Sequence, residues 1–507
     1  MNVIDRVIDA VAPVWGVRRA AARLALAGYG YGEASRAYAA AKNGRRNKGW
    51  NGRSTSANAE IGSSLRDLRN RSREFVRDSW AGQRMLDVLT SHVVGTGIIT
   101  VPDTGSDRDD NRAKLVFEEW SAVADVERFL DWQGMQAMVL RSMVEGGDTV
   151  VRYIDIKMSD AGRTVPFRLL GLEGDQIDTA KDAVAVASGE HSIRLGVQLG
   201  EWGRRQGLHL LESHPGELVL GSGRSNFIAW EDLSHVFRPL RWGQVRGVPW
   251  FSGILLNARE VQDLIEATLV KARTEACFAG FVKRTSGGMS PLSRQSKDGD
   301  AGQKVTKIEP GMIADIGDGE ISFASPSSQT AFGEVYMTAM QAMAAGAGIT
   351  YDQLTGDLRQ ANYSSLRAGK IEFRRLVEQI QWTVLVPQLL APVHRRLIDR
   401  AILAGKIRDR RDGYRLDHIM PAVEPIDPKK DLEADILAVR AGRMSPQEFI
   451  GAWGRDWRKV TDDTASFFEH LDKLRDGTGL PLDIDGRRPM KGASGDGKEP
   501  AKADDGE

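Results

Sequence analysis

Apolar residues recur every three or four positions in several stretches of the chain, and the longest such stretch predicts a long helix. From Ile254 to Ala279 they fall at helical spacing with charged residues between them. Pro249 stands upstream, where proline's fixed φ is tolerated, and Gly280 follows, as glycine commonly does after a helix end. The pattern predicts a rod of about 25 residues, roughly 40 Å long.

Weaker helical periodicity predicts further helices on both sides of this rod. They cover Leu65–Leu89, Leu115–Trp120, Phe129–Val144, Val335–Ala345, Phe373–Val384, Asp431–Arg440 and Phe467–Leu474. Pro387 and Pro392 are expected to kink or end the helix that contains Val384. Ser445, Pro446 and Glu448 form a capping box, which predicts one more helix start.

Alternating apolar and polar positions predict strands mainly in the middle of the chain. The expected strands are Ile98–Val101, Thr149–Ile154, Phe167–Asp178 and Phe227–Pro239, with hairpins at Ile193–Glu217 (turning near Glu201–Arg204) and Glu309–Phe323. Helices and strands occur in separate runs. This order predicts an α+β fold.

The overall charge is balanced, which restricts the class of partner. Lys plus Arg and Asp plus Glu both number 69 in 507 residues, so the formal net charge is zero. A protein that holds nucleic acid by neutralising phosphates is usually basic. Neutrality therefore argues against a static DNA binder, but it is compatible with a channel through which DNA slides.

The charge is less even locally. Residues 1–84 carry 16 Lys or Arg against 7 Asp or Glu, and the Gly-, Asn- and Arg-rich run from Lys42 to Glu60 predicts an irregular arm. Such an arm either wraps a neighbour or DNA, or is a solvated tail. Residues after about Gly477 are expected to be disordered. The lone Cys277 is expected to pack, and no apolar run is long enough to span a membrane.

No recognisable catalytic or metal-binding constellation emerges. The sequence lacks GxxxxGK[ST], HExxH, CxxC and GxSxG motifs. Gly95 and Gly97 lack the residues that complete a phosphate loop, and Asp352, Asp357 and Asn362 lack the ligand spacing of a calcium loop. We therefore expect no catalytic residue, no metal and no cofactor.

Several ordered motifs resemble the lambda-type family of tailed-phage portal proteins. They are RNRSREFVRDS followed by VVGTGI, RWGQVRGVPWFSG before the long helix, PGMI, and the run from Tyr351 to Arg367. The residues that carry the resemblance most clearly are Arg246, Gly247, Pro249, Asn362, Tyr363, Ser364 and Ser365. The resemblance spans about residues 61–457.

The resemblance implies a portal fold assembled as a ring, with wing, stem, clip and crown regions. It places a basic arm at 1–60, wing segments at 61–128 and 285–420, and stem helices at 129–148 and 251–284. The clip falls at 149–250, the helical crown at 421–476 and a disordered tail at 477–507. The second wing segment would contain a kinked helix and a tunnel loop.

The resemblance also implies a non-enzymatic virion protein at the portal vertex of the capsid, made in the bacterial host cytoplasm. A twelve-fold ring would pass double-stranded DNA during packaging and ejection, and would bind the terminase large subunit, the major capsid and scaffold proteins, and later a head–tail adaptor, with no membrane partner. Lys271, Arg273, Lys283 and Arg284 are candidates for charge rings facing DNA or for ion pairs between subunits. The alternatives are a metal-dependent nucleic-acid-processing phage enzyme and a purely structural capsid or adaptor subunit.

Overall fold

The fold comes from a computed structural model. It describes residues 52, 54–182, 191–217, 223–277, 281–282, 314–315, 329–359, 363–425 and 427–478. The chain divides into two units, Met1–Ser56 and Ala57–Glu507, and the architecture below concerns the second. Most of the predicted arm, tail and second wing loops lies outside the described residues. The arm was predicted to reach residue 60, but the first described helix already begins at Ala57.

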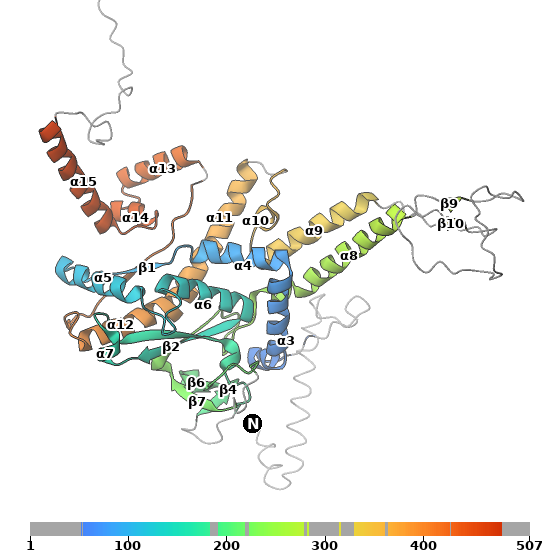
Figure 1. The fold of residues 1–507 in the computed structure, drawn as a ribbon, viewed down its shortest axis with the longest axis horizontal. Helices are drawn as coiled ribbons and strands as arrows, with labels where there is room; N and C mark the ends of the chain where they lie inside the picture. Colours follow the sequence, from blue (N-terminus) through green and yellow to red (C-terminus); the bar gives the residue numbers. More distant parts are fainter. Residues whose placement is uncertain are drawn as a thin grey trace, which may run out of the picture. The chain divides into compact units, whose positions relative to one another are not determined.

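A large apolar core organises the second unit. Figure 1 shows the elements around it. The helices around it are α3 (Ala57–Asp78), α4 (Trp80–Val93), α5 (Asp107–Ser121) and α6 (Trp132–Gly146), joined by parts of the later helices. Trp120 stacks on Phe167 with ring centroids 5.7 Å apart, and its indole N–H donates to the Phe167 carbonyl at 2.8 Å. The buried indole therefore keeps a hydrogen-bond partner.

Helix α6 begins three residues later than its periodicity predicts. Asp131 accepts a hydrogen bond from the Gly134 N–H at 2.7 Å and caps the helix there. Phe129, the expected first residue, is 85% exposed, because the preceding backbone turns around Asp125. The predicted stop is confirmed, since Gly147 adopts a φ of +94° immediately after the helix.

A three-stranded antiparallel sheet separates two apolar clusters. Its order is β3 (Phe167–Glu173), β2 (Asp148–Asp155), β8 (Leu233–Phe237). Successive β2 residues point to opposite faces, so Val151 joins the main core while Val150 joins a smaller cluster. Both side chains are fully buried.

The smaller cluster belongs to a four-stranded antiparallel sheet of β4 (Ser192–Arg194), β5 (Val197–Leu199), β6 (Arg205–Leu211) and β7 (Ser225–Ala229). The predicted hairpin around Glu201–Arg204 is confirmed as β5–β6. The prediction of one strand over Phe227–Pro239 is wrong. The 3-10 turn η5 (Trp230–Asp232) divides it into β7 and β8, which lie in different sheets.

The predicted long helix is confirmed as α8 (Leu255–Cys277), which contacts α9 (Gln329–Ala347) and α3. Beyond α8, β9 (Phe281–Val282) pairs in parallel with β10 (Ala314–Asp315). The rest of the hairpin predicted over Glu309–Phe323 lies outside the described residues.

Proline does not interrupt the helical path after α9. Following α10 (Tyr351–Thr355), α11 (Tyr363–Ile380) continues into the π-helix η7 (Gln381–Leu390) and then α12 (Ala391–Leu403). Pro387 lies inside η7 and Pro392 inside α12. Of the two expected outcomes, a kink or an end, the end is wrong. The wider π turn places Gln381 on the Val93 carbonyl (2.8 Å) and Gln388 on the Phe237 N–H (2.9 Å).

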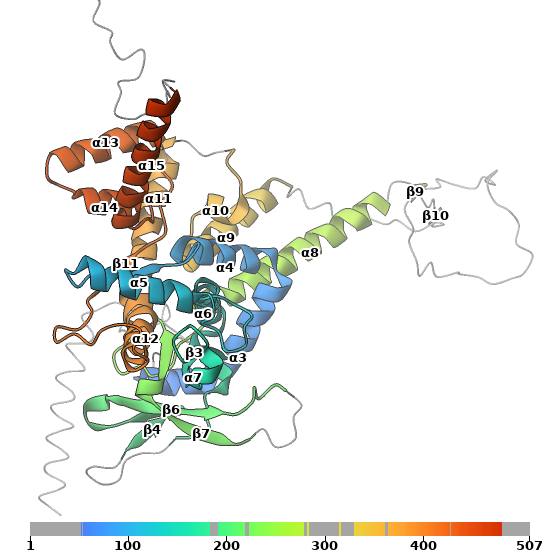
Figure 2. The ribbon, with the colours of Figure 1, turned by 60° about the vertical axis from the view of Figure 1, so that its left-hand side comes forward.

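After α12 come a strand and then helices. Strand β11 (Leu416–Ile419) pairs with β1 (Ile99–Pro102), and α13 (Pro428–Arg440), α14 (Pro446–Gly451) and α15 (Trp457–Thr478) follow (Figure 2). The predicted capping box is confirmed at the start of α14, where Ser445 and Glu448 bond reciprocally. The remaining short elements are α7 (Met158–Ala161) and the 3-10 turns η3 (Gly174–Gln176), η4 (Glu201–Gly203) and η6 (Trp250–Gly253).

Candidate functional site

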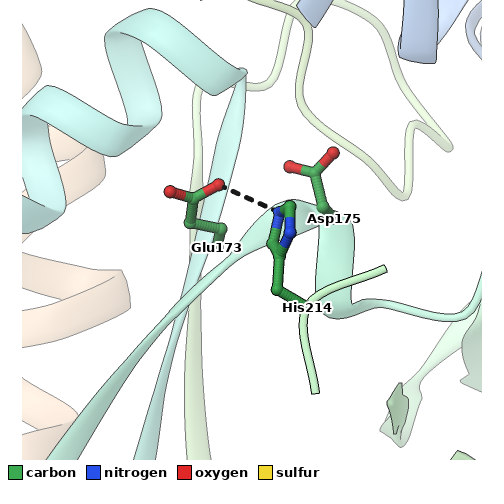
Figure 3. A group of neighbouring side chains, drawn as sticks. All are labelled: Glu173, Asp175 and His214. Atoms are coloured by element: carbon green, nitrogen blue, oxygen red, sulfur yellow. Dashed lines mark ion pairs between the residues drawn. The ribbon is translucent and has the colours of Figure 1, made fainter. Parts of the chain in front are cut away.

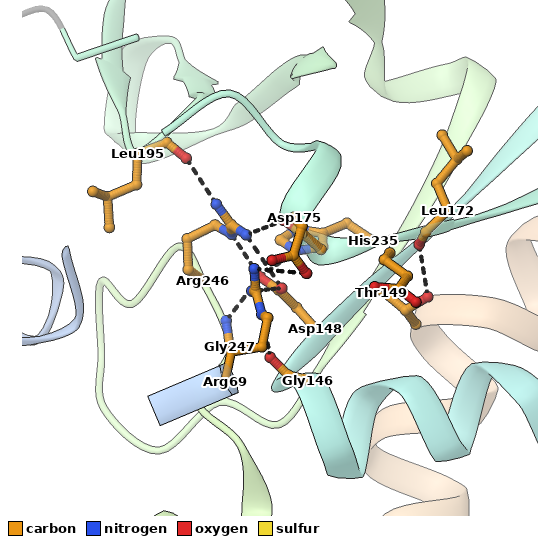
Figure 4. Close-up of polar contacts among 12 residues, drawn as sticks. Arg69, Gly146, Asp148, Thr149, Leu172, Asp175, Leu195, His235, Arg246 and Gly247 are labelled. Atoms are coloured by element: carbon orange, nitrogen blue, oxygen red, sulfur yellow. Dashed lines mark hydrogen bonds and ion pairs between the residues drawn. The ribbon is translucent and has the colours of Figure 1, made fainter. Parts of the chain in front are cut away.

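The segment that carries the sequence motif RGVP, residues 246–249, is called the strap here. It passes over a buried polar cluster, which we call the joint: Arg69, Asp148, Arg205, His235 and Arg246 (Figure 4 labels all of these except Arg205). Arg246 is fully buried. Its Nε donates to Asp148 Oδ2 at 2.5 Å and its Nη2 to the Gly174 carbonyl at 2.6 Å. A third bond runs from Nη1 to the Leu195 carbonyl at 3.2 Å. This motif arginine therefore ties the strap to three other segments.

Asp148 is the common acceptor of the joint. Arg69 donates to Oδ1 at 2.8 Å, while His235 Nε2 and the Gly247 N–H approach Oδ2 at 3.3 Å and 3.2 Å. Burial by itself would raise the pKa of Asp148. The charge of Arg246, the hydrogen bond from His235 and the charge of Arg69 outweigh it and hold the pKa well below its usual range. The carboxylate stays ionised and its oxygens are occupied.

His235 and Arg205 complete the joint from the β-rich side. Burial lowers the pKa of His235 to about 4, so the ring is neutral at pH 7. Arg205 can only donate, so His235 Nδ1 accepts from its Nη1 at 3.2 Å and the ring proton sits on Nε2, facing Asp148. Burial also lowers the pKa of Arg205 to about 10. Its guanidinium lies 4.7 Å from the Phe237 ring centroid.

Two glycines let the strap approach the end of α6. A Cβ on Gly247 would lie 1.9 Å from the Gly147 carbonyl oxygen, which no side chain can occupy. Gly147 has a φ of +94°, and a Cβ there would lie 2.8 Å from the Pro249 nitrogen. The motif residues Gly247 and Pro249 thus sit where the two backbones cross.

The joint connects α3, the α6–β2 corner, β8, the four-stranded sheet and the strap that leads into α8. Its members come from residues 69, 148, 205, 235 and 246, so no local sequence pattern reveals it. Of the five members, only Arg246 was singled out from the sequence; Arg69, Asp148, Arg205 and His235 were missed. The only signal in the sequence is an acidic residue directly after the glycine pair 146–147, between the predicted helix and the predicted strand.

The other predicted site residues lie elsewhere. On α8, Lys271 is half-buried and Arg273 is exposed, whereas Lys283 and Arg284 fall outside the described residues. Asn362 is also outside them, and Tyr363, Ser364 and Ser365 form the first turn of α11. Among the described residues, none from α11 takes part in the joint. The two groups of motif residues are therefore not brought together.

A metal site requires several ligand atoms close together. Among the described residues, one group meets this requirement: Glu173, Asp175 and His214, whose ligand atoms all lie within 4.8 Å of one another (Figure 3). Arg73 already bonds both carboxylates, at 2.7 Å to Asp175. The Gly216 N–H donates to His214 Nδ1 at 3.1 Å, which leaves the ring proton on Nε2, 3.4 Å from Glu173. A metal would have to displace both Arg73 and that proton. These side chains fit an ion-pair cluster and not a metal site.

Four tryptophans of the β-rich region, Trp202, Trp230, Trp242 and Trp250, divide into two kinds. Trp230 and Trp250 are packed within the chain, the latter donating to the Ala347 carbonyl at 2.8 Å. Trp202 and Trp242 are fully exposed at the tips of turns. Only the second pair has its whole side chain open to contacts with another molecule.

Comparison with known proteins decides the family. The sequence model of the lambda family of phage portal proteins matches residues 43–381. The chain belongs to this family. Membership makes it a structural, non-enzymatic component of the phage virion and confirms the sequence-based resemblance. Within the described part of the chain, we find no helix with the length and apolar character needed to cross a bilayer.

Curated relatives agree with this assignment. A probable portal protein of Halomonas phage phiHAP-1 is 24% identical over 459 residues, covering 85% of this chain and 87% of the relative. Portal protein B of Escherichia phage lambda is 22% identical over 312 residues, covering 53% and 57%.

Solved structures show a more distant likeness. A chain in the virion of a native gene transfer agent particle is 14% identical with a TM-score of 0.39, covering 75% of this chain and 89% of that one. A chain in the neck of the same kind of particle, computed with C12 symmetry, is 15% identical with a TM-score of 0.39, covering 76% and 92%.

Proposed function

We propose that twelve copies of this chain form the ring at one capsid vertex through which double-stranded DNA enters during packaging and leaves during ejection. Family membership carries the proposal. One heterologous interface repeated about an axis closes into a ring and encloses a channel. The terminase large subunit would dock on this ring during packaging, the head–tail adaptor afterwards, and the capsid and scaffold proteins would surround it.

The α8–α9 pair supports an assembly of this kind. Leu256, Leu269 and Val270 on α8 and Val335 on α9 are each more than half exposed. Exposed apolar residues of this size on two neighbouring helices are available for an interaction. A neighbouring subunit in a ring would cover them.

We assign the regions of the chain by the same proposal. The clip would be residues 149–250, with the joint connecting it to the wing and to α8. The stem helices would be 129–148 and 251–284, although α6 buries eight of its residues within its own chain. Residues 61–128 and 285–420 would be the wing, with its tunnel loop, and α13–α15 would lie in the crown at 421–476.

Repetition would convert single charges on α8 into rings. Lys271 and Arg273, with Lys283 and Arg284 beyond them, would face DNA phosphates or form ion pairs between subunits. Basic contacts to DNA weaken steeply with salt. Removing one of these charges would separate the two roles. Loss of a contact to DNA would change DNA transit, and loss of an ion pair between subunits would change assembly.

The first test is negative-stain electron microscopy of the full chain, combined with mass measurement by light scattering. We expect rings with a central hole and a mass near twelve subunits. A small, stable oligomer that cleaves DNA when a divalent metal is added would overturn the proposal in favour of a nuclease.

A further inference from the structure

Helices α13, α14 and α15, which we call the C-terminal helices, lie outside the large apolar core of the subunit. Among the described residues, no member of that core lies beyond Ile407, and the partly buried apolar residues that pack against it end at Met420. Neither α13 nor α14 contains a buried residue, and Leu471 is the one buried apolar residue described in α15. Elements with few buried apolar contacts are the ones that open or move most easily.

The C-terminal helices nevertheless belong together. Helix α13 contacts α14, and α14 contacts α15. The three helices are grouped together in both Figure 1 and Figure 2. Contacts with one another and few contacts with the core are the properties of a unit that can change position as a whole.

A groove of about 570 Å³ separates α13 and the end of α14 from α11 and η7. Its walls include Trp382 on η7 and Trp453 just after α14, which are 52% and 41% exposed. A closely packed interface would cover aromatic side chains of this size. The C-terminal helices are therefore not closely packed against α11 along this groove, which leaves room for movement.

Charged residues at the start of α15 attach the C-terminal helices to α5. The Lys114 ammonium donates to the Asp456 carboxylate at 2.6 Å, and these side chains are only 24% and 9% exposed. Asp456 also accepts from the Arg458 N–H at 3.1 Å, within the first turn of α15. The Arg458 guanidinium faces three carboxylates from the start of α5 and the turn before it: Asp103 at 3.4 Å, Asp110 at 3.7 Å and Asp107 at 4.0 Å. We call Asp456, Arg458 and these four partners the α15 anchor.

Arg458 is held loosely within the α15 anchor. Its one hydrogen bond to a carboxylate, to Asp103 at 3.4 Å, is long for a charged pair. Among the described residues, neither Arg458 Nε nor Asp110 Oδ2 has a hydrogen-bond partner, although both atoms are buried. In the joint, by contrast, the carboxylate oxygens of Asp148 are occupied. An incompletely satisfied charged group favours a second arrangement in which it is solvated or better paired.

We propose that the C-terminal helices move as a unit on the rest of the subunit, and that the α15 anchor holds them in one of two positions. When the α15 anchor dissociates, the helices would swing away from α5 and the groove beside α11 would change its width. The large apolar core would stay intact, because it contains no described residue of these helices. The inference concerns a single subunit and does not depend on the proposed ring.

Ionic strength should control the α15 anchor. The Arg458 and Asp103 side chains are 24% and 33% exposed, and Asp107 is 90% exposed. Mobile ions reach contacts of this kind and screen them, and exposed pairs contribute little once they are screened. The Lys114–Asp456 pair is shorter and less exposed, so it would keep the helices in place at low salt.

The test measures one distance within a subunit, from α5 to α13, in the full-length chain. Cys277→Ala removes the natural cysteine, and Glu118→Cys and Leu437→Cys place nitroxide labels at two exposed positions. Labelled chains are mixed with an excess of unlabelled chains, so that pairs of labels arise within one copy. Double electron–electron resonance then gives the distribution of distances at about 0.05 M and about 1 M NaCl, the latter having a Debye length of about 3 Å.

Two matched variants separate the α15 anchor from a general effect of charge. Arg458→Met removes the arginine from the α15 anchor. Arg455→Met removes the same charge three residues earlier, at an exposed position outside it. Circular dichroism during urea unfolding shows whether each variant keeps the cooperative unfolding of the whole chain.

We expect one main distance in the unsubstituted labelled chain at low salt. A second distance should rise in population roughly fivefold or more at high salt, and also in Arg458→Met at low salt, whereas Arg455→Met should match the unsubstituted chain. An unchanged single distance at high salt and in Arg458→Met would overturn the inference, since the C-terminal helices would then be fixed. Loss of cooperative unfolding in Arg458→Met, with no effect of salt on the unsubstituted chain, would also overturn it, because the α15 anchor would then support the core.

Discussion

Arg246 and Asp148 form a doubly hydrogen-bonded ion pair from which solvent is excluded. Their contacts measure 2.5 Å and 3.2 Å, and neither side chain has any exposed surface. A buried pair contributes little net stability compared with apolar residues of similar size, but removing one partner leaves an uncompensated charge. The pair therefore acts mainly to fix which segments meet at the joint.

Replacing this arginine should be strongly destabilising. In Arg246→Met, Asp148 loses two donors while remaining buried, and we expect a loss of about 3–5 kcal/mol in the free energy of unfolding. Urea denaturation followed by tryptophan fluorescence measures it. Arg241→Met is the control, because the Arg241–Glu60 pair is exposed and should cost about 1 kcal/mol or less. Equal losses in both variants would contradict the assigned role.

The position where the backbones of Gly147 and Gly247 cross should tolerate no side chain. In Gly247→Ala the new methyl group would meet the Gly147 carbonyl oxygen, which is backbone and cannot rotate away. We expect a loss of roughly 2–4 kcal/mol, or failure to fold, as for other overpacked positions. Gly171→Ala, where a Cβ meets nothing within 4 Å, should change stability by less than about 1 kcal/mol. The fraction of expressed protein that is soluble and the midpoint of urea unfolding distinguish the two variants.

Local features of this fold were predictable because their causes are local. The spacing of apolar residues identified α8, and Ser445 with Glu448 identified the start of α14. The joint was not predictable, since Arg69, Asp148 and Arg246 are separated by 79 and 98 residues and their meeting depends on tertiary packing. For the same reason, the sequence did not show that β7 and β8 join different sheets. Pro387 was expected to kink or end the helix, and the sequence did not show that the path continues as a π-helix, because that element had no recognisable sequence signal.

Acid should destabilise the fold in a definite pH range. Burial lowers the pKa of His235 and of His394 to about 4, whereas an unfolded histidine titrates near 6.5. Between these values the unfolded chain binds more protons, so stability is complete above about pH 6.5 and falls as the pH drops towards 4. Urea midpoints measured from pH 8 to pH 4 test this expectation.

A variant isolates one of these two histidines. His394 packs against Phe117, Trp120 and Trp132, so His394→Met keeps the position apolar while removing its titration. We expect the loss of stability between pH 6.5 and pH 4 to become smaller by about 1–3 kcal/mol. An unchanged pH profile would show that His394 is not the buried neutral group that the geometry indicates.

The π-helix should depend on its two glutamines, because each satisfies a backbone group on another element. Gln381 is buried and donates to the Val93 carbonyl at the end of α4, at 2.8 Å. In Gln381→Leu that carbonyl keeps its burial but loses its donor, which should cost about 1–3 kcal/mol. Gln379→Leu, at an exposed position two residues earlier, should cost less than about 0.5 kcal/mol. Hydrogen exchange should locate the effect in α4 and η7. If the Gln381 variant instead loosens only α11, the bridging role assigned to the π turn is wrong.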